Sequence, residues 1–416
     1  MAEASTTTPK KKPKRVNLRT PEVMEVVQNQ VENHYRSRVV DYIRHSGNSL
    51  TANGLTVKLA KAFGFCYGVE RAIDLAYASA KHFDGKKIYL LGEIIHNPEV
   101  NDQLNEMGIT SLLEDPEKGW DLSHVTEDDV VIVPAFGSPV DVMDQISEIG
   151  CFVVDTTCGD VMSVWKRIKQ YKREHVTSII HGKATHEETK ATSSRALRED
   201  GEGHYLIVYD LNETDYVCDY IRNGGDKEAF LKKFEGAYSP EFDPDLHLQA
   251  IGVANQTTMM RGETEEVQNR MMQAIKDRYG EQEVGNHFRF FDTICGATQE
   301  RQDALDVMLN TPMDLLVVVG GYNSSNTSHL AEMGEKILPT YFIKNGDKMR
   351  SPSLIEHYNQ HIGVEETSEN WLPDAPITVG VTAGASCPNN LIEETITRLF
   401  EFRGVDVIQL LPEKFR

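Results

Sequence analysis

Three similar stretches decide the fold of this chain: KLAKAFGFCYGVERAIDLA at residues 58–76, CFVVDTTCGDVMSVWKRIKQ at 151–170 and FRFFDTICGATQERQDAL at 288–305. Each places a cysteine after a short apolar or β-favouring run and before an amphipathic stretch that is typical of a helix. The cysteines are Cys66, Cys158 and Cys295. Their equivalent settings predict three equivalent lobes that each contribute one thiolate to a common centre. Three thiolates are one short of a closed tetrahedral site, so a metal centre here would keep a position open for substrate.

The repeat continues beyond the cysteines. Nine strand-like runs end in small or polar residues and precede helix-like patterns, in the order GFCYG, IIHNPEV, VIVPAFGSP, DTTCGD, SIIHGKATHEET, IGVANQTTM, DTICGAT, LLVVVGGYNSSNTS and ITVGVTAGASCP. A cysteine loop, a loop rich in His or in Ser and Asn, and a loop of small residues recur three times. Self-similarity of this kind indicates repeated structural units. Alternating strands and helices predict parallel sheets, which bind ligands at the carboxyl ends of their strands.

We therefore predict an α/β protein with three pseudo-equivalent lobes, small parallel sheets around a central site, and an N-terminal helical extension. The expected parts are an extension at 1–57, lobes at 58–152, 153–288 and 289–402, and a C-terminal tail at 403–416. Within the extension, proline and like charge predict a disordered arm over 1–20, and residues 21–45 have helical periodicity. The stretches 210–250 and 343–376 are interpreted as surface insertions, because they contain acidic, Pro and Gly residues.

Composition limits the possible partners. The 416 residues carry a formal net charge of −21, which argues against nucleic acid as the main partner because a phosphate backbone needs clustered Lys and Arg. No apolar run approaches the roughly 18 residues of a membrane span, and no secretory signal opens the chain. The sequence therefore fits a soluble protein of the cytosol or of an organelle matrix.

The three repeated cysteines favour an iron–sulfur site. None of the six cysteines forms a C-x-x-C pair, which speaks against a zinc finger or a thioredoxin-type site. Three cysteines without an obvious fourth ligand fit a 4Fe–4S cluster with one open iron, and a three-cysteine zinc site is the competing interpretation. For Cys151, Cys218 and Cys387 the sequence predicts buried or free thiols.

The remaining loops carry groups suited to an anion. The second loops supply His96, His186 and the run Asn323–Asn326, and the third loops supply Thr257, Thr258 and Ser386. Imidazoles, hydroxyls and amides at helix starts suit an oxygen-rich anion such as a diphosphate, although a single Ser or Thr there is more often a helix cap. The HEE run at 186–188 sets a carboxylate beside a histidine, which makes it a candidate proton donor or simply an acidic helix start.

Taken together, the motifs resemble one enzyme family. GFCYGVERAI, EIIHNPEVN, PAFGSP, DTTC, HGKATHEET, ANQTT, ICGATQERQDA, GGYNSSNTSHLAE and VTAGASCP occur in matching order from about residue 58 to 402. These motifs and their order resemble those of the 4-hydroxy-3-methylbut-2-enyl diphosphate reductase family, most closely those of its plant and cyanobacterial branch. The resemblance implies a three-lobed α/β protein that catalyses the last step of the methylerythritol phosphate route to isoprenoids.

The resemblance also implies roles for individual residues. Cys66, Cys158 and Cys295 would hold one 4Fe–4S cluster, and Glu188 would deliver the proton, with Glu187 as the fallback. The residues expected around the substrate are His96, His186, Thr257, Ser324, Ser325, Asn326 and Ser386. The implied reaction is a two-electron reductive dehydroxylation that gives isopentenyl and dimethylallyl diphosphate. Ferredoxin or flavodoxin is the expected electron donor, because no flavin or NAD fingerprint is visible. The expected location is the bacterial cytoplasm, or the plastid stroma in a eukaryote.

Two positions depart from the family pattern. Phe136 stands where many bacterial members carry a histidine, and the plant-like branch also has phenylalanine at this position. Gly159 follows Cys158 where the family usually has proline. The glycine is expected to loosen the cysteine loop.

Two alternative functions remain open. One is that of quinolinate synthase, another three-lobed protein with a three-cysteine cluster. The other is an iron-cluster sensor or scaffold without turnover.

Overall fold

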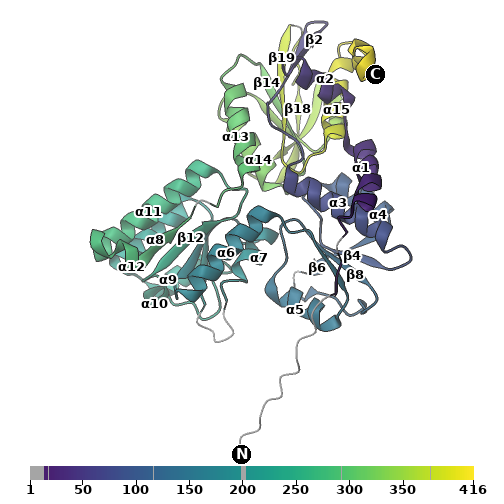
Figure 1. Cartoon of the computed structure of the whole chain (residues 1–416). Helices are drawn as coiled ribbons and strands as arrows, with labels where there is room; N and C mark the ends of the chain where they lie inside the picture. Colours follow the sequence, from purple (N-terminus) through teal and green to yellow (C-terminus); the bar gives the residue numbers. More distant parts are fainter. Residues whose placement is uncertain (1–13, 17, 116, 198–202, 292, 375) are drawn as a thin grey trace, which may run out of the picture.

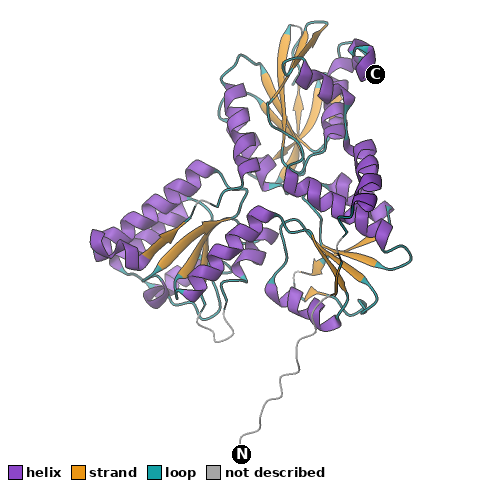
Figure 2. Ribbon diagram, in the orientation of Figure 1, coloured by secondary structure: helices purple, strands orange, loops and turns teal. Residues whose placement is uncertain are grey.

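The computed structural model describes residues 14–16, 18–115, 117–197, 203–291, 293–374 and 376–416. Three separate sheets, each covered by helices, surround a common centre (Figures 1 and 2). The predicted three-lobed α/β architecture is confirmed. The arm expected to be disordered lies outside the described residues from 1 to 13, but Lys14–Arg15 form the short strand β1. This strand pairs with Phe152 and Val153 at the edge of the first sheet.

The first sheet has five parallel strands in the order β1-β9-β8-β4-β5. Its strands after β1 are β4 (Ile88–Leu91), β5 (Ile109–Leu112), β8 (Val130–Val133) and β9 (Phe152–Asp155). The lobe also contains α3 (Tyr67–His82), α4 (Pro98–Glu106), α5 (Val140–Ile149) and the hairpin of β6 (Glu114–Asp115) and β7 (Gly119–Trp120). β4 and β8 are buried along their whole length, as a parallel strand covered on both faces should be.

The second sheet is parallel in the order β11-β10-β12-β13. Its strands are β10 (Thr177–His181), β11 (Tyr205–Val208), β12 (Ile251–Asn255) and β13 (Phe288–Phe290). The helices of this lobe are α6 (Gly159–Arg173), α7 (Glu187–Ser193), α8 (Leu211–Asn223), α9 (Lys227–Lys233), α10 (Pro244–His247), α11 (Arg261–Tyr279) and α12 (Val284–His287).

The third sheet has the order β15-β14-β19-β3-β2, and only β2 is antiparallel. Its strands are β2 (Ser49–Ala52), β3 (Leu55–Leu59), β14 (Leu315–Val319), β15 (Thr340–Ile343) and β19 (Ile377–Ala383). Its helices are α13 (Gly296–Leu309), α14 (Ser325–Glu335), α15 (Asn389–Glu401) and α16 (Val407–Leu410). Residues 21–45 form two helices, α1 (Pro21–Tyr35) and α2 (Arg38–His45), because Ser37 breaks the pattern and caps the second.

The lobes interlock at the cysteines. The predicted boundaries at 58, 153 and 289 fall within the strands β3, β9 and β13. These strands belong to the third, first and second sheets, respectively. The helix after each cysteine packs in the next lobe: α3 on the first sheet, α6 on the second and α13 on the third. Each cysteine therefore lies at a crossing between two lobes.

The two predicted surface insertions have different outcomes. The stretch 210–250 contributes core side chains, since Val217, Ile221, Phe230 and Phe234 are buried against α11 and the second sheet, so the prediction of a surface insertion is wrong there. Its acidic and glycine residues occupy the exposed turns and helix faces between these apolar positions. The stretch 343–376 contains an antiparallel sheet of β16 (Met349–Ser351), β17 (Leu354–Asn359) and β18 (Val364–Glu369), and β18 is largely exposed.

Candidate active site

All eleven residues predicted to form the site line one cavity. The cavity holds about 110 Å³ and lies where the carboxyl ends of the three parallel sheets meet. It is lined by the thiols Cys66, Cys158 and Cys295, and by His96, His186, Glu188, Thr257, Ser324, Ser325, Asn326 and Ser386. These side chains come from loops that follow eight different strands, and they meet because the three sheets point at one centre.

The three cysteines occupy the same position in three helices. Cys66, Cys158 and Cys295 are the N-cap residues of α3, α6 and α13, and each is partly buried. Unpaired backbone N–H groups and the helix dipole stabilise a thiolate at such a position. A Cβ atom on Gly68 would lie 2.6 Å from the Cys158 sulfur and 3.9 Å from that of Cys66, so only glycine allows these two thiols to approach α3 together.

Arginines join the cysteine loops to neighbouring lobes. Arg71 of α3 donates to the carbonyl oxygens of Thr156 and Thr157, beside Cys158, at 3.1 and 3.3 Å. Arg301 of α13 donates to those of Gly64 and Phe65, beside Cys66, at 2.6 and 3.1 Å. In α6 the Arg167 guanidinium lies 3.8 Å from the ring centroid of Phe291, near Cys295. Each helix that begins at one cysteine thus holds the loop of another.

The residues fit a metal group with three thiolate ligands. Without a bound metal, burial raises the pKa of the Cys295 thiol to about 12 and also raises the pKa of the Cys158 thiol. Bound metal would replace these protons and remove the cost of burying a thiolate. The other cysteines, Cys151, Cys218 and Cys387, are fully buried in hydrophobic clusters and do not line the cavity.

Glu188 is a buried carboxyl group held in place by one residue. The Thr257 amide donates to its Oε1 at 2.6 Å and the Thr257 hydroxyl donates to its Oε2 at 2.9 Å. Only 3% of Glu188 is exposed. Burial raises its pKa to about 7, and the two hydrogen bonds from Thr257 oppose part of that shift. A carboxyl group with this pKa can hold a proton and release it near neutral pH.

His186 presents a hydrogen-bond donor to the cavity. Its ring caps α7, where Nδ1 accepts the backbone N–H of Glu188 at 3.2 Å. Burial holds the pKa of His186 well below its ordinary value, so the ring is neutral. A neutral ring that accepts at Nδ1 carries its proton on Nε2, and this buried atom has no partner among the described residues.

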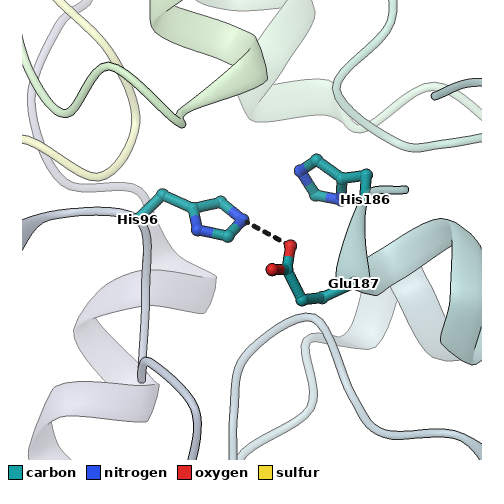
Figure 3. Close-up of side chains that lie close together, drawn as sticks. All are labelled: His96, His186 and Glu187. Atoms are coloured by element: carbon teal, nitrogen blue, oxygen red, sulfur yellow. Dashed lines mark ion pairs between the residues drawn. The ribbon is translucent and has the colours of Figure 1, made fainter. Parts of the chain in front are cut away.

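His96 is fixed from three sides. Its Nδ1 lies 3.0 Å from Glu93 Oε2 and 3.3 Å from the Asn323 amide nitrogen, and its ring stacks on Phe136 at 4.7 Å between centroids. Its Nε2 faces Glu187 Oε2 at 3.5 Å (Figure 3). Phe136, noted as a departure from the bacterial pattern, therefore supports the imidazole of His96.

The third lobe contributes hydroxyls and amides. Ser324 caps α14, and Ser386 Oγ donates to the His96 carbonyl at 3.2 Å and lies 3.3 Å from Ser324 Oγ. Asn326 accepts the Ala385 N–H at 2.9 Å, while its buried Nδ2 has no partner in the described chain. Gly321 permits the close fit of this loop, because a Cβ there would clash with the His96 carbonyl.

Sequence reasoning missed several residues of the cavity. Asp160, Val161 and Thr298 also line it, and Glu93 orients His96. The first three follow a cysteine by two or three residues, so their place in the first helical turn was a usable signal. For Glu93, three residues before His96, the sequence gives no sign that the chain turns back between them.

No helix among the described residues is long and apolar enough to cross a membrane.

Comparisons with known proteins agree with the predicted resemblance. A family model described as LytB protein matches residues 57–400. The 4-hydroxy-3-methylbut-2-enyl diphosphate reductase of a Cyanothece strain is 46% identical over 371 residues, which cover 89% of this chain and 90% of that protein. The protein of the same name from Gloeobacter violaceus is 48% identical over 384 residues, with coverages of 91% and 90%.

Two solved structures share the fold. One is described as (E)-4-hydroxy-3-methyl-but-2-enyl diphosphate reductase, the terminal enzyme of the non-mevalonate pathway. It matches with a TM-score of 0.50 and 24% identity, covering 83% of this chain and 99% of that one. The other, a reductase from Plasmodium falciparum, has a TM-score of 0.60 and 22% identity, with coverages of 83% and 89%.

Proposed function

The chain belongs to the LytB family, and from that premise we propose that it is a 4-hydroxy-3-methylbut-2-enyl diphosphate reductase. The observation that carries the proposal is the convergence of three helix-capping cysteines, a buried carboxyl group and a set of neutral donors on one cavity. The reaction adds two electrons and two protons to the allylic alcohol. It breaks the carbon–oxygen bond, forms a carbon–hydrogen bond, and gives water with isopentenyl or dimethylallyl diphosphate.

Members of this family are iron–sulfur enzymes, and the finer assignment is that Cys66, Cys158 and Cys295 hold one 4Fe–4S cluster. When bound, such a cluster supplies the electrons and a Lewis-acidic iron that the protein leaves open. The three helix N-termini stabilise the thiolates, and Gly68 provides the space in which two of them approach α3.

The groups that bind the diphosphate include buried hydrogen-bond donors with no partner among the described residues. His186 Nε2–H and the Asn326 amide are buried and unpaired among the described residues, and the Ser324 and Ser386 hydroxyls lie beside them. His96 lines the same cavity. No Lys or Arg side chain lines the cavity within the described chain, so neutral donors and His96 carry the recognition. Thr257 uses its hydroxyl on Glu188, so its part in the reaction is to position that carboxyl group.

Glu188 is the proton donor. Its pKa of about 7 keeps a useful fraction protonated at neutral pH, and its proton converts the departing hydroxyl into water. Glu187, the alternative, is half-exposed and turned toward His96, where water would compete for its proton. The cavity walls Ile95, Val69 and Val161 exclude water and hold the allyl fragment in one orientation.

The electrons come from an external donor, for which ferredoxin or flavodoxin is proposed. Cyanobacterial relatives support a location in the bacterial cytoplasm or the plastid stroma.

The test is anaerobic turnover of the reconstituted protein with 4-hydroxy-3-methylbut-2-enyl diphosphate and a reduced viologen dye. Dye oxidation with formation of both five-carbon diphosphates is expected. An intact iron–sulfur absorbance without turnover would overturn the proposal and direct the next tests to quinolinate synthesis and cluster sensing.

A further inference from the structure

Glu187 carries a carboxylate to the edge of the anion-binding donors. It is the first residue of α7, and its Oε2 lies 3.5 Å from His96 Nε2. One ligand atom from each of His96, His186 and Glu187 lies within 4.8 Å of the other two (Figure 3). The Glu187 side chain is 50% exposed, whereas that of His96 is 10% exposed. The carboxylate can therefore move into solvent while the ring cannot.

The two imidazoles present their Nε2 atoms to the same place. Nε2 of His96 and Nε2 of His186 are buried and make no hydrogen bond in the described part of the chain. The opposite nitrogens are occupied, by Glu93 Oε2 at 3.0 Å and by the Glu188 N–H at 3.2 Å. Because His186 accepts at Nδ1, its Nε2 offers a proton and not a lone pair, which suits an anion better than a metal ion.

We infer that Glu187 is an internal competitor for the diphosphate of substrate and product, an assignment that rests on the proposed function. An anion bound to both Nε2 atoms would lie within a few ångströms of the Glu187 carboxylate, where two like charges repel. The substrate therefore displaces Glu187 from His96. When product leaves, the His96–Glu187 pair forms again and offsets part of the free energy of releasing a diphosphate.

The surroundings leave Glu187 free to make this exchange. Glu187 also lines two further cavities, of about 360 and 260 Å³, so the displaced carboxylate has space to enter. Lys190, one turn along α7, is paired with Glu114 at 2.8 Å. Among the described residues, His96 is the ion-pair partner of Glu187.

The test measures binding of inorganic diphosphate to the cluster-containing protein by anaerobic calorimetry. Glu187→Gln keeps the size of the side chain and removes its charge. Its dissociation constant for diphosphate is expected to fall about twofold to fivefold, the range for losing one half-exposed ionic competitor. Product inhibition by dimethylallyl diphosphate should strengthen by the same factor.

Glu332→Gln is the matched control. Glu332 lines one of the same neighbouring cavities and its substitution removes one negative charge, but its side chain is not among those that line the active-site cavity. Its diphosphate affinity should match that of the wild type.

Unchanged or weaker binding in Glu187→Gln, or an equal gain in both variants, would overturn the inference. Tighter binding without turnover of any variant would support the competitor and overturn the proposed reaction. Absence of diphosphate binding in every variant would overturn both.

Discussion

Replacing Thr257 with valine removes one of the two donors that hold Glu188. The substitution keeps the side-chain shape and the backbone N–H at 2.6 Å from Oε1, but it removes the hydroxyl at 2.9 Å from Oε2. A hydrogen bond to a buried charged group is worth about 1.5–3 kcal/mol, and 1.36 kcal/mol corresponds to one pKa unit. Because the lost bond favours the charged form, the pKa of Glu188 should rise from about 7 by about one to two units.

The sign of the pH effect follows from the role of the group. A proton donor must be protonated, so activity falls as pH rises through the pKa of Glu188. In Thr257→Val that alkaline limb should move upward by at least one unit in a profile of kcat against pH, measured anaerobically with reduced viologen. Thr257→Ser retains the hydroxyl and is the control, with a limb close to that of the wild type.

A different result would separate two roles for Thr257. The family resemblance implies that Thr257 contacts the substrate, whereas in the structure its hydroxyl donates to Glu188. If the hydroxyl served the substrate, Thr257→Val would raise KM and leave the alkaline limb where it is. A fixed limb, or one that moves to lower pH, would refute the reasoning about Glu188.

Four further substitutions test the assignment of the site. Glu188→Gln should keep the iron and lose most turnover. Because the pKa of Glu188 is raised from 4.5 to about 7 in the folded protein, the wild type loses folding stability as pH rises through this range and the carboxyl group ionises. Glu188→Gln does not ionise, so its stability relative to the wild type should increase by up to about 3 kcal/mol over the same range. Chemical denaturation of both proteins at pH 5 and pH 8 measures the difference. Cys387→Ser should retain iron and colour, since that thiol is fully buried outside the cavity, and a colourless protein would contradict the ligand assignment. Gly68→Ala should lower iron content, because its Cβ would lie 2.6 Å from the Cys158 sulfur, whereas Gly262→Ala, which meets no atom within 4 Å, should bind iron normally. Phe136→Ala should raise KM about twofold to tenfold through loss of the ring stacked on His96. An unchanged KM would mean that Glu93 and Asn323 orient the imidazole without the ring.

Local patterns predicted the loops, and three-dimensional pairing decided how they are grouped. All nine predicted strand ends follow parallel strands, because a buried parallel strand and its loop can be recognised in a short window. That β3 pairs with β19, more than 300 residues later, has no local signature. The interlocking of the lobes at Cys66, Cys158 and Cys295 could therefore not be predicted from periodicity.

The sequence predicts the location of single residues in the cavity better than it predicts their roles. Ser324 and Thr257 were expected near substrate and do line the cavity, but Ser324 also caps α14 and Thr257 holds Glu188. A hydroxyl has the same sequence signature in each role, and only the partner atom distinguishes them. In the stretch 210–250, polar residues are interspersed with an apolar stripe that includes Val217 and Ile221, so composition alone does not reveal its buried side chains.

The interlocked lobes connect metal binding to substrate geometry. His96 comes from the first lobe, Glu188 from the second and Ser386 from the third, so their separation depends on how the lobes are placed. The helices that place the lobes begin at the three cysteines, and arginines from these helices contact the neighbouring cysteine loops. A displacement of about 1 Å between reacting groups can cost on the order of a hundredfold in rate. Metal ligands at the three cysteines, where the lobes cross, therefore fix the distance between the proton donor and the diphosphate site. Three ligands within a single lobe would not fix this distance.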